Sequence, residues 1–98
     1  MDTKSEIVQA LQKHEAEIRQ FGVQKLGIFG SFSRDTANKE SDIDFVVIFE
    51  PGKKNFSRYI DLVFFLEDLS SRNADVLTPE SMSPYLKPHI LEELEYVI

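Results

Sequence analysis

The sequence predicts an α/β (α+β) protein in which a small mixed sheet of about three strands is flanked by helices. Three observations carry this prediction. The chain has 98 residues, enough for one hydrophobic core and short of the size at which chains split. Segments with a helical period alternate with short β-branched and aromatic runs. Hydrophobic residues make up 42% and charged residues 29%, as in ordinary globular proteins. We therefore expect one domain spanning residues 1–98.

The first part of the chain is expected to form a helix, a strand and a second, brief helix. Residues 4–21 place their apolar side chains on one helical face, and Gly22 is a suitable C-cap. The apolar run 25–29 reads as a buried strand, and a short helix is predicted from Ser31 to Arg34. The polar residues 35–41 should form a loop.

The central part should add two strands and the helix between them. Residues 42–49 are β-branched or aromatic outside two acids, and the turn signal 50–52 ends the run. Capping residues near Asn55 precede an amphipathic helix that runs to about Ser71. A third short strand is predicted over residues 74–77.

The last segment begins at residues 78–80 and is expected to end in a short apolar helix. Pro84 and Pro88 interrupt its helical pattern, which resumes with the apolar positions from Ile90 to Val97. We find no internal repeat, low-complexity tract or linker.

The charge and the absence of cysteine exclude several classes of protein. A net charge of −6 disfavours a protein that binds nucleic acid by neutralising its phosphates. Without cysteine there is no disulfide framework and no thiolate metal site. No apolar run approaches the ~20 residues that span a bilayer, so we expect a cytoplasmic protein with no membrane partner. His14 and His89 are isolated, which makes a zinc site improbable.

Two acids mark the start of the second predicted strand. Asp42 and Asp44 flank Ile43, so both carboxylates should share one face of the strand while Ile43 enters the core. Carboxylate oxygens suit Mg²⁺, which fills its remaining positions with water and phosphate oxygens. Like charges this close cost stability, so a function or a cation should offset them. The alternative is a strand-entry cap at Asp42 and an edge charge at Asp44 that limits aggregation.

A third carboxylate is commonly needed where two metal ions assist an in-line displacement, either to fix an ion or to accept a proton. Asp75 is the candidate, because apolar residues flank it in the next predicted strand. Asp61 and Asp68 compete for the role, but both fall inside the helical pattern. Asp75 as a simple strand-start residue remains the alternative.

Gly30 and Ser31 lie where the first strand should give way to a helix. Such a junction offers backbone N–H groups to an anion such as phosphate. The Ser31 hydroxyl could bind a nucleotide phosphate, and Arg34, one turn on, could add its guanidinium. The alternative is a plain turn with a solvated Arg34.

Together these residues resemble a known family. The pair Gly30-Ser31, then Arg34, then residues 41–44 with sequence Ser-Asp-Ile-Asp, an apolar strand and Asp75 look like the nucleotidyltransferase superfamily. The likeness is to its short form, the minimal nucleotidyltransferase (MNT) antitoxins that pair with HEPN-domain toxins. It covers nearly the whole chain, and implies the nucleotidyltransferase fold and one minimal nucleotidyltransferase domain.

The resemblance also implies a reaction and its residues. Asp42 and Asp44 would bind two Mg²⁺ ions, Asp75 would complete the catalytic and metal-binding triad, and Gly30 and Ser31 would hold the triphosphate of ATP. The implied activity transfers AMP from Mg-ATP to a tyrosine of a HEPN-type ribonuclease toxin and neutralises it. The partner would form a hetero-oligomer with this chain.

The sequence departs from the family at two positions, where the family often has Ala at Ser33 and Gly at Asp35. If the family glycine relieves a positive φ, Asp35 tolerates that conformation better than most residues. An extra acid near a triphosphate should nevertheless slow catalysis.

Two other functions compete with the adenylyltransferase. One is a non-catalytic antitoxin that binds and occludes the toxin, and the other is a small-molecule nucleotidyltransferase. The catalytic core uses nearly all 98 residues, so an acceptor that brings its own surface, a protein, is favoured. Part of the docking surface could come from the apolar residues Tyr85, Leu86, Ile90, Leu94 and Val97, although closing the core is the expected role of most of them.

Overall fold

The structure is a computed structural model that describes residues 3–98, and one four-stranded sheet forms its centre. The strands are β1 (Val23–Phe29), β2 (Ile43–Phe49), β3 (Ala74–Leu77) and β4 (Glu95–Tyr96). Their spatial order is β3-β2-β1-β4. β1 is antiparallel to β2 and β4, whereas β2 and β3 are parallel. The predicted mixed sheet is therefore confirmed and gains a fourth strand.

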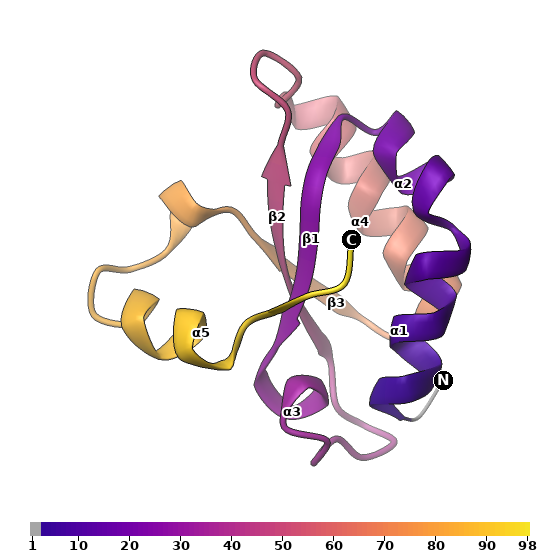
Figure 1. Cartoon of the computed structure of the whole chain (residues 1–98), viewed down its shortest axis with the longest axis vertical. Helices are drawn as coiled ribbons and strands as arrows, with labels where there is room; N and C mark the ends of the chain where they lie inside the picture. Colours follow the sequence, from indigo (N-terminus) through magenta and orange to yellow (C-terminus); the bar gives the residue numbers. More distant parts are fainter. Residues whose placement is uncertain (1–2) are drawn as a thin grey trace.

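Helices lie on both sides of this sheet. They are α1 (Lys4–Lys13), α2 (Glu15–Gln20), α3 (Gly30–Ser33), α4 (Phe56–Ser70) and α5 (Lys87–Glu93), with a three-ten turn η1 (Pro79–Ser81). α1, α2 and α4 cover one face, and α5 projects from the opposite side (Figure 1). Within residues 3–98, no helix has the length and apolar character needed to cross a membrane.

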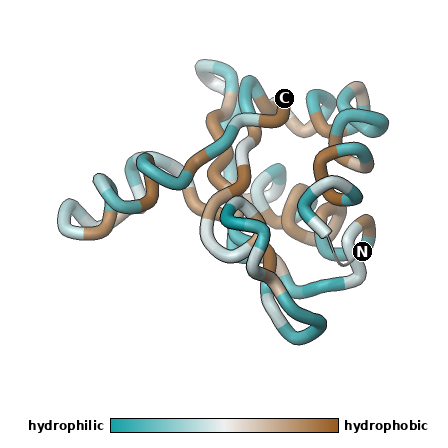
Figure 2. Tube along the Cα trace, turned by 60° about the horizontal axis from the view of Figure 1, so that its bottom comes forward, coloured by the Kyte–Doolittle hydropathy of each residue, from teal (hydrophilic) through white to brown (hydrophobic). Residues whose placement is uncertain are grey.

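The hydrophobic core fills the space between the sheet and α1, α2 and α4. Side chains alternate between the two faces of a strand, and those that turn toward these helices are buried. The core includes Ile7, Leu11, Ile18, Leu26, Ile28, Ile43, Phe45, Val47, Leu62, Leu66 and Val76. Figure 2 shows the hydrophobic stretches concentrated along the strands and the inner sides of the helices. The alternation sends Asp44 and Asp75 to the other face.

The N-terminal helix begins as a helix but is divided in two, which corrects the prediction of one helix over 4–21. Thr3 and Glu6 form a capping box at the start of α1. His14 then leaves helical geometry, with φ −103° and ψ 20°. Its ring packs edge-on against Phe65 of α4 at a centroid distance of 6.1 Å and is hydrogen-bonded to Glu17 at 2.8 Å. These contacts hold the chain at the break.

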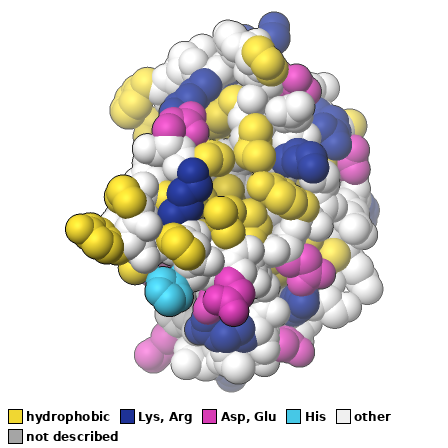
Figure 3. All heavy atoms as spheres, turned by 60° about the vertical axis from the view of Figure 1, so that its left-hand side comes forward, with side chains coloured by type: hydrophobic (Ala, Val, Ile, Leu, Met, Phe, Trp, Pro, Cys, Tyr) yellow, Lys and Arg dark blue, Asp and Glu magenta, His cyan; other side chains and the backbone are white. Residues whose placement is uncertain are grey.

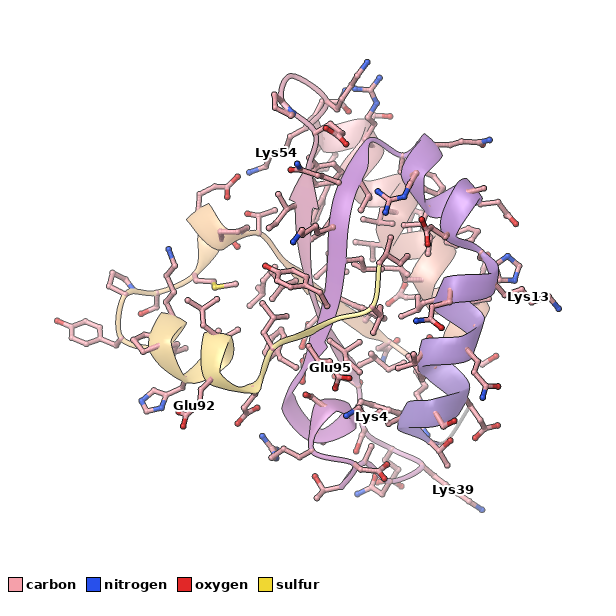
Figure 4. All side chains as sticks on the ribbon, viewed as in Figure 1. Lys4, Lys13, Lys39, Lys54, Glu92 and Glu95 are labelled. Carbon is pink, nitrogen blue, oxygen red and sulfur yellow. The ribbon has the colours of Figure 1, made fainter. Side chains whose placement is uncertain are left out.

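The C-terminal helix ends earlier than predicted, because residues 95–96 form β4 instead of continuing it. β4 pairs with Gly27 and Ile28 of β1. A side chain at Gly27 would collide with Leu94, so glycine allows this crossing. Glu95 also forms an ion pair with Lys4 of α1, and the two side chains lie close together in Figure 4. The pattern of apolar residues was helical, but pairing with the exposed edge of β1 decided the structure.

Candidate active site

The starts of two neighbouring strands bring the predicted acids together. Asp44 of β2 and Asp75 of β3 are partners in the parallel register, so their side chains leave the same face of the sheet. Their carboxyl groups are close enough to raise the pKa of Asp44, and Asp42, just before β2, adds its charge to this effect. Ile43 between the two acids is fully buried, as predicted. The structure thus places all three acids at one end of the sheet.

This arrangement changes the acidity of Asp44. Burial, followed by the charge and hydrogen bond of Asp75 and the charge of Asp42, raises the pKa of Asp44 from 3.8 to about 6, although Arg34 opposes the shift. Crowded carboxyl groups resist ionising together. A cation bound among them would relieve the repulsion.

Asp44→Asn is expected to stabilise the protein at pH 7.5 without metal, by about 1–2 kcal/mol after allowance for solvent screening. The raised pKa means that the folded state binds more protons than the unfolded state between pH 3.8 and about 6. Wild-type stability contributed by this group is therefore complete below pH 3.8 and lost as the pH rises through about 6. Urea unfolding in EDTA at pH 4 and at pH 7.5 measures the difference in free energy of unfolding between Asp44→Asn and wild type. This difference should be smaller at pH 4. A variant less stable than wild type at pH 7.5 would contradict the prediction.

The loop that carries Asp42 is fixed by Arg72. The Arg72 guanidinium donates hydrogen bonds of 2.7 Å to the carbonyl oxygens of Asn38 and Ser41. It also lies over the Phe32 ring, 4.9 Å from the ring centroid. These contacts tie the loop to α3 just before β2 begins, which positions the backbone of Asp42.

The competing acids Asp61 and Asp68 lie on α4, as predicted, and both are exposed. Asp68 borders an open polar hollow of about 380 Å³ that also reaches Asp42 and Glu67. Neither Asp61 nor Asp68 is among the groups that shift the pKa of Asp44. We conclude that Asp75 is the third acid at the strand starts.

Gly30 brings the backbone of the turn after β1 against Asp44. Phe29 is the register partner of Asp44 in the antiparallel pair, and Gly30 follows it with φ +71°. A Cβ atom at Gly30 would collide with the Asp44 carboxylate. Glycine is required here for two reasons, the positive φ and the close approach. The turn, including Ser31 at the start of α3, therefore lies beside the acids.

Arg34 follows α3 and is bound by a residue that the sequence did not indicate. Its Nη1 donates to both carboxylate oxygens of Glu93, each at 2.7 Å. The Gly30 N–H donates to the same carboxylate at 3.0 Å. Glu93 ends α5 in an acidic, apolar stretch, and no local signal separates it from Glu92 beside it. Only the tertiary structure brings it to this turn.

The two departures from the family pattern also lie here. Asp35 has φ 60°, so this position does have the positive φ that a family glycine would accommodate. The Ser33 hydroxyl donates to the backbone oxygen of Glu93 at 2.5 Å. Ser33 therefore adds a link to α5 that alanine could not provide.

The residues present are suited to Mg²⁺ even though they form no complete cage. Within residues 3–98, no group of three or more His, Cys, Asp or Glu side chains is arranged as a ready metal cluster. Mg²⁺ commonly uses one or two carboxylates and completes its shell with water and substrate phosphates. Asp42, Asp44 and Asp75 offer hard oxygen ligands beside an electropositive Arg34. The chemistry of the donors fits Mg²⁺ brought in with a nucleotide.

A sheet that carries acids at two adjacent strand starts, with a glycine turn against them, is the arrangement expected from the resemblance to nucleotidyltransferases. The family model described as nucleotidyltransferase domain matches residues 6–97. The chain belongs to this family, which confirms the fold and the resemblance found in the sequence.

Individual relatives and solved structures show which members of the family this chain resembles. The chain is 35% identical to the protein adenylyltransferase MntA of Thermococcus cleftensis, covering 99% of this chain and 98% of that protein. It is 37% identical to a candidate protein adenylyltransferase of Methanocaldococcus jannaschii, covering 99% and 100%. A solved candidate minimal nucleotidyltransferase matches with a TM-score of 0.75 and 25% identity over 97% of this chain and 95% of that one. The fold also matches an MNT antitoxin in complex with a tri-AMPylated HEPN toxin of Shewanella oneidensis, with a TM-score of 0.65, 18% identity and coverage of 93% and 71%.

Proposed function

We propose that this protein is an antitoxin that transfers AMP from Mg-ATP to a tyrosine of a HEPN-type ribonuclease toxin and thereby neutralises it. The observation that carries the proposal is the pairing of Asp44 with Asp75 beside Asp42, against the Gly30 turn. Similarity to a named protein adenylyltransferase over nearly the full length supports the activity. The fold shared with an MNT antitoxin bound to an AMPylated toxin supports the partner.

In the proposed reaction the tyrosine oxygen attacks the α-phosphorus of ATP and pyrophosphate leaves. A new oxygen–phosphorus bond forms as the bond to the bridging oxygen breaks. Mg²⁺, when bound by Asp42 and Asp44, supplies charge neutralisation at the phosphates. Asp75, the register partner of Asp44 on the neighbouring strand, would help fix an ion or accept the tyrosine proton. Gly30, Ser31 and Arg34 bind the triphosphate.

An exposed apolar surface on the α5 side supports a protein partner. The exposed fraction is 87% for Tyr85, 58% for Leu86, 48% for Leu91 and 42% for Tyr96. Hydrophobic side chains gather on this face of the molecule in Figure 3. A monomer rarely exposes large apolar side chains together, and this surface adjoins the segment that holds Glu93 against the turn. The same surface would serve a non-catalytic antitoxin, so binding alone does not identify the mechanism.

The direct test is incubation with ATP, Mg²⁺ and the product of the adjacent gene, as the expected HEPN toxin, followed by intact mass spectrometry. We expect the toxin to gain one or more adenylyl groups and to lose ribonuclease activity. EDTA should prevent both changes, because the carboxylates need the cation to bind and activate the nucleotide. Neutralisation of the toxin without any gain in mass would replace the proposal with occlusion.

A further inference from the structure

Glu93 joins the C-terminal segment to the turn that carries the proposed nucleotide site. Its carboxylate accepts hydrogen bonds from the Gly30 N–H at 3.0 Å and from Arg34 Nη1 at 2.7 Å. The sequence separations are 63 and 59 residues. A third bond, from the Ser33 hydroxyl, reaches the Glu93 backbone. One residue thus contacts the start, the middle and the end of the 30–34 turn.

The contact leaves Arg34 able to bind a second anion. A guanidinium carries five N–H donors, and Arg34 uses only Nη1 for Glu93. Within residues 3–98, its Nε and Nη2 donate no hydrogen bond. The Arg34 charge also acts on Asp44, so the guanidinium that Glu93 binds is near the acids. An arginine side chain that a carboxylate already holds in one conformation loses less conformational entropy when it binds a phosphate.

Glu93 is held in place by structure on both sides of it. It is the last residue of α5, and the next residues cross β1 at Gly27 and pair there as β4. The N–H groups of Val97 and Ile98 donate to the Leu26 oxygen at 2.9 and 3.2 Å. These pairings fix the backbone of Glu93 beside the turn. This position favours a role in which Glu93 supports the turn, over one in which its side chain leaves when the nucleotide binds.

We propose that Glu93 is a positioning residue of the nucleotide site, which holds the Gly30 turn and aims Arg34 at the triphosphate. The inference rests on the proposed function, because it assumes that this turn binds ATP. The opposite possibility is that the carboxylate occupies the position of a phosphate and must be displaced. The two possibilities predict opposite effects of Glu93 on nucleotide affinity, because a positioning residue strengthens nucleotide binding and an occupying anion weakens it.

The test measures binding of the non-hydrolysable analogue AMP-PNP with Mg²⁺ by calorimetry, without toxin. Glu93→Ala should weaken binding about tenfold, and Glu93→Gln, which keeps one acceptor oxygen, should weaken it less. Glu92→Gln is the matched control, since Glu92 is an exposed acid next to Glu93 on the same helix. Its affinity should equal that of wild type. Thermal melts establish that each variant is folded.

A double-mutant cycle separates positioning from a general structural role. If Glu93 acts through Arg34, the losses from Arg34→Ala and Glu93→Ala should not add in the double variant. In the transfer reaction, the KM for ATP should rise more than kcat falls. Additive losses, or AMP-PNP binding by Glu93→Ala as tight as wild type or tighter, would overturn the inference.

The inference and the proposed function can fail separately. A wild-type protein that binds AMP-PNP but adds no AMP to the toxin would remove the proposed function and leave the Glu93 measurement valid. Transfer by the wild type, with unchanged AMP-PNP affinity in both Glu93 variants, would remove only the inference. A wild type that binds no AMP-PNP would remove both.

Discussion

Asp44→Asn is expected to lower adenylyl transfer by at least about 100-fold while the protein remains folded. Loss of a charged group that stabilises the transition state commonly costs this much or more. Asparagine keeps the shape of the side chain and removes the charge that a metal ion needs. Because the pKa of Asp44 is raised to about 6, the same change should stabilise the metal-free protein. Transfer rates by intact mass and unfolding curves on one sample measure both effects.

A loss of activity together with a gain of stability cannot be attributed to unfolding. Asp61→Asn is the matched control, because Asp61 is an exposed acid on α4, and its transfer rate should be unchanged. Binding of Asp44→Asn to the toxin should also be retained, since the apolar surface is not altered. If this variant still neutralises the toxin as well as wild type does, the protein acts by occlusion and the acids are not catalytic.

The grouping of Asp42, Asp44 and Asp75 could be predicted from the sequence because it depends on local features. Asp42 and Asp44 lie on either side of a core residue at a strand start, which a period of two predicts directly. Asp75 was found from its apolar flanks, and the crossover through α4 makes β3 the parallel neighbour of β2. Two short-range patterns and one general rule of topology therefore suffice to bring Asp44 and Asp75 into register.

Glu93 was not accessible, because its position depends on contacts between distant segments. The apolar spacing after Pro88 fits a helix, yet residues 95–96 pair with β1, where Gly27 provides room. Only after that pairing does the end of α5 come to lie beside the Gly30 turn. The early end of the first helix at His14 has a similar origin, a contact with Phe65 in α4. The local spacing of apolar residues cannot predict either contact, because each joins segments that are distant in the sequence.

Gly30→Ala is expected to lower both AMP-PNP affinity and the transfer rate by about 100-fold. Gly30 has φ +71°, where an alanine costs about 1–2 kcal/mol. The new methyl group would also meet the Asp44 carboxylate, so either the turn or the acid must move. A displacement of this kind separates the proposed triphosphate donors from the proposed metal ligands, and misplacement of about 1 Å can cost 100-fold in rate. Calorimetry and intact mass spectrometry measure the two losses.

Gly52→Ala isolates the part of this effect that comes from the collision. Gly52 has φ +77°, nearly the same strain, but a Cβ atom there has no neighbour within 4 Å. Both variants should therefore lose similar stability from the backbone, and only Gly30→Ala should lose nucleotide binding. Equal losses of function in the two would mean that strain alone is responsible and that the contact between the turn and Asp44 has no catalytic role. If Gly30→Ala still transferred AMP at the wild-type rate, the triphosphate would have to bind away from this turn. A triphosphate site at the turn should lose activity when the turn or Asp44 is displaced.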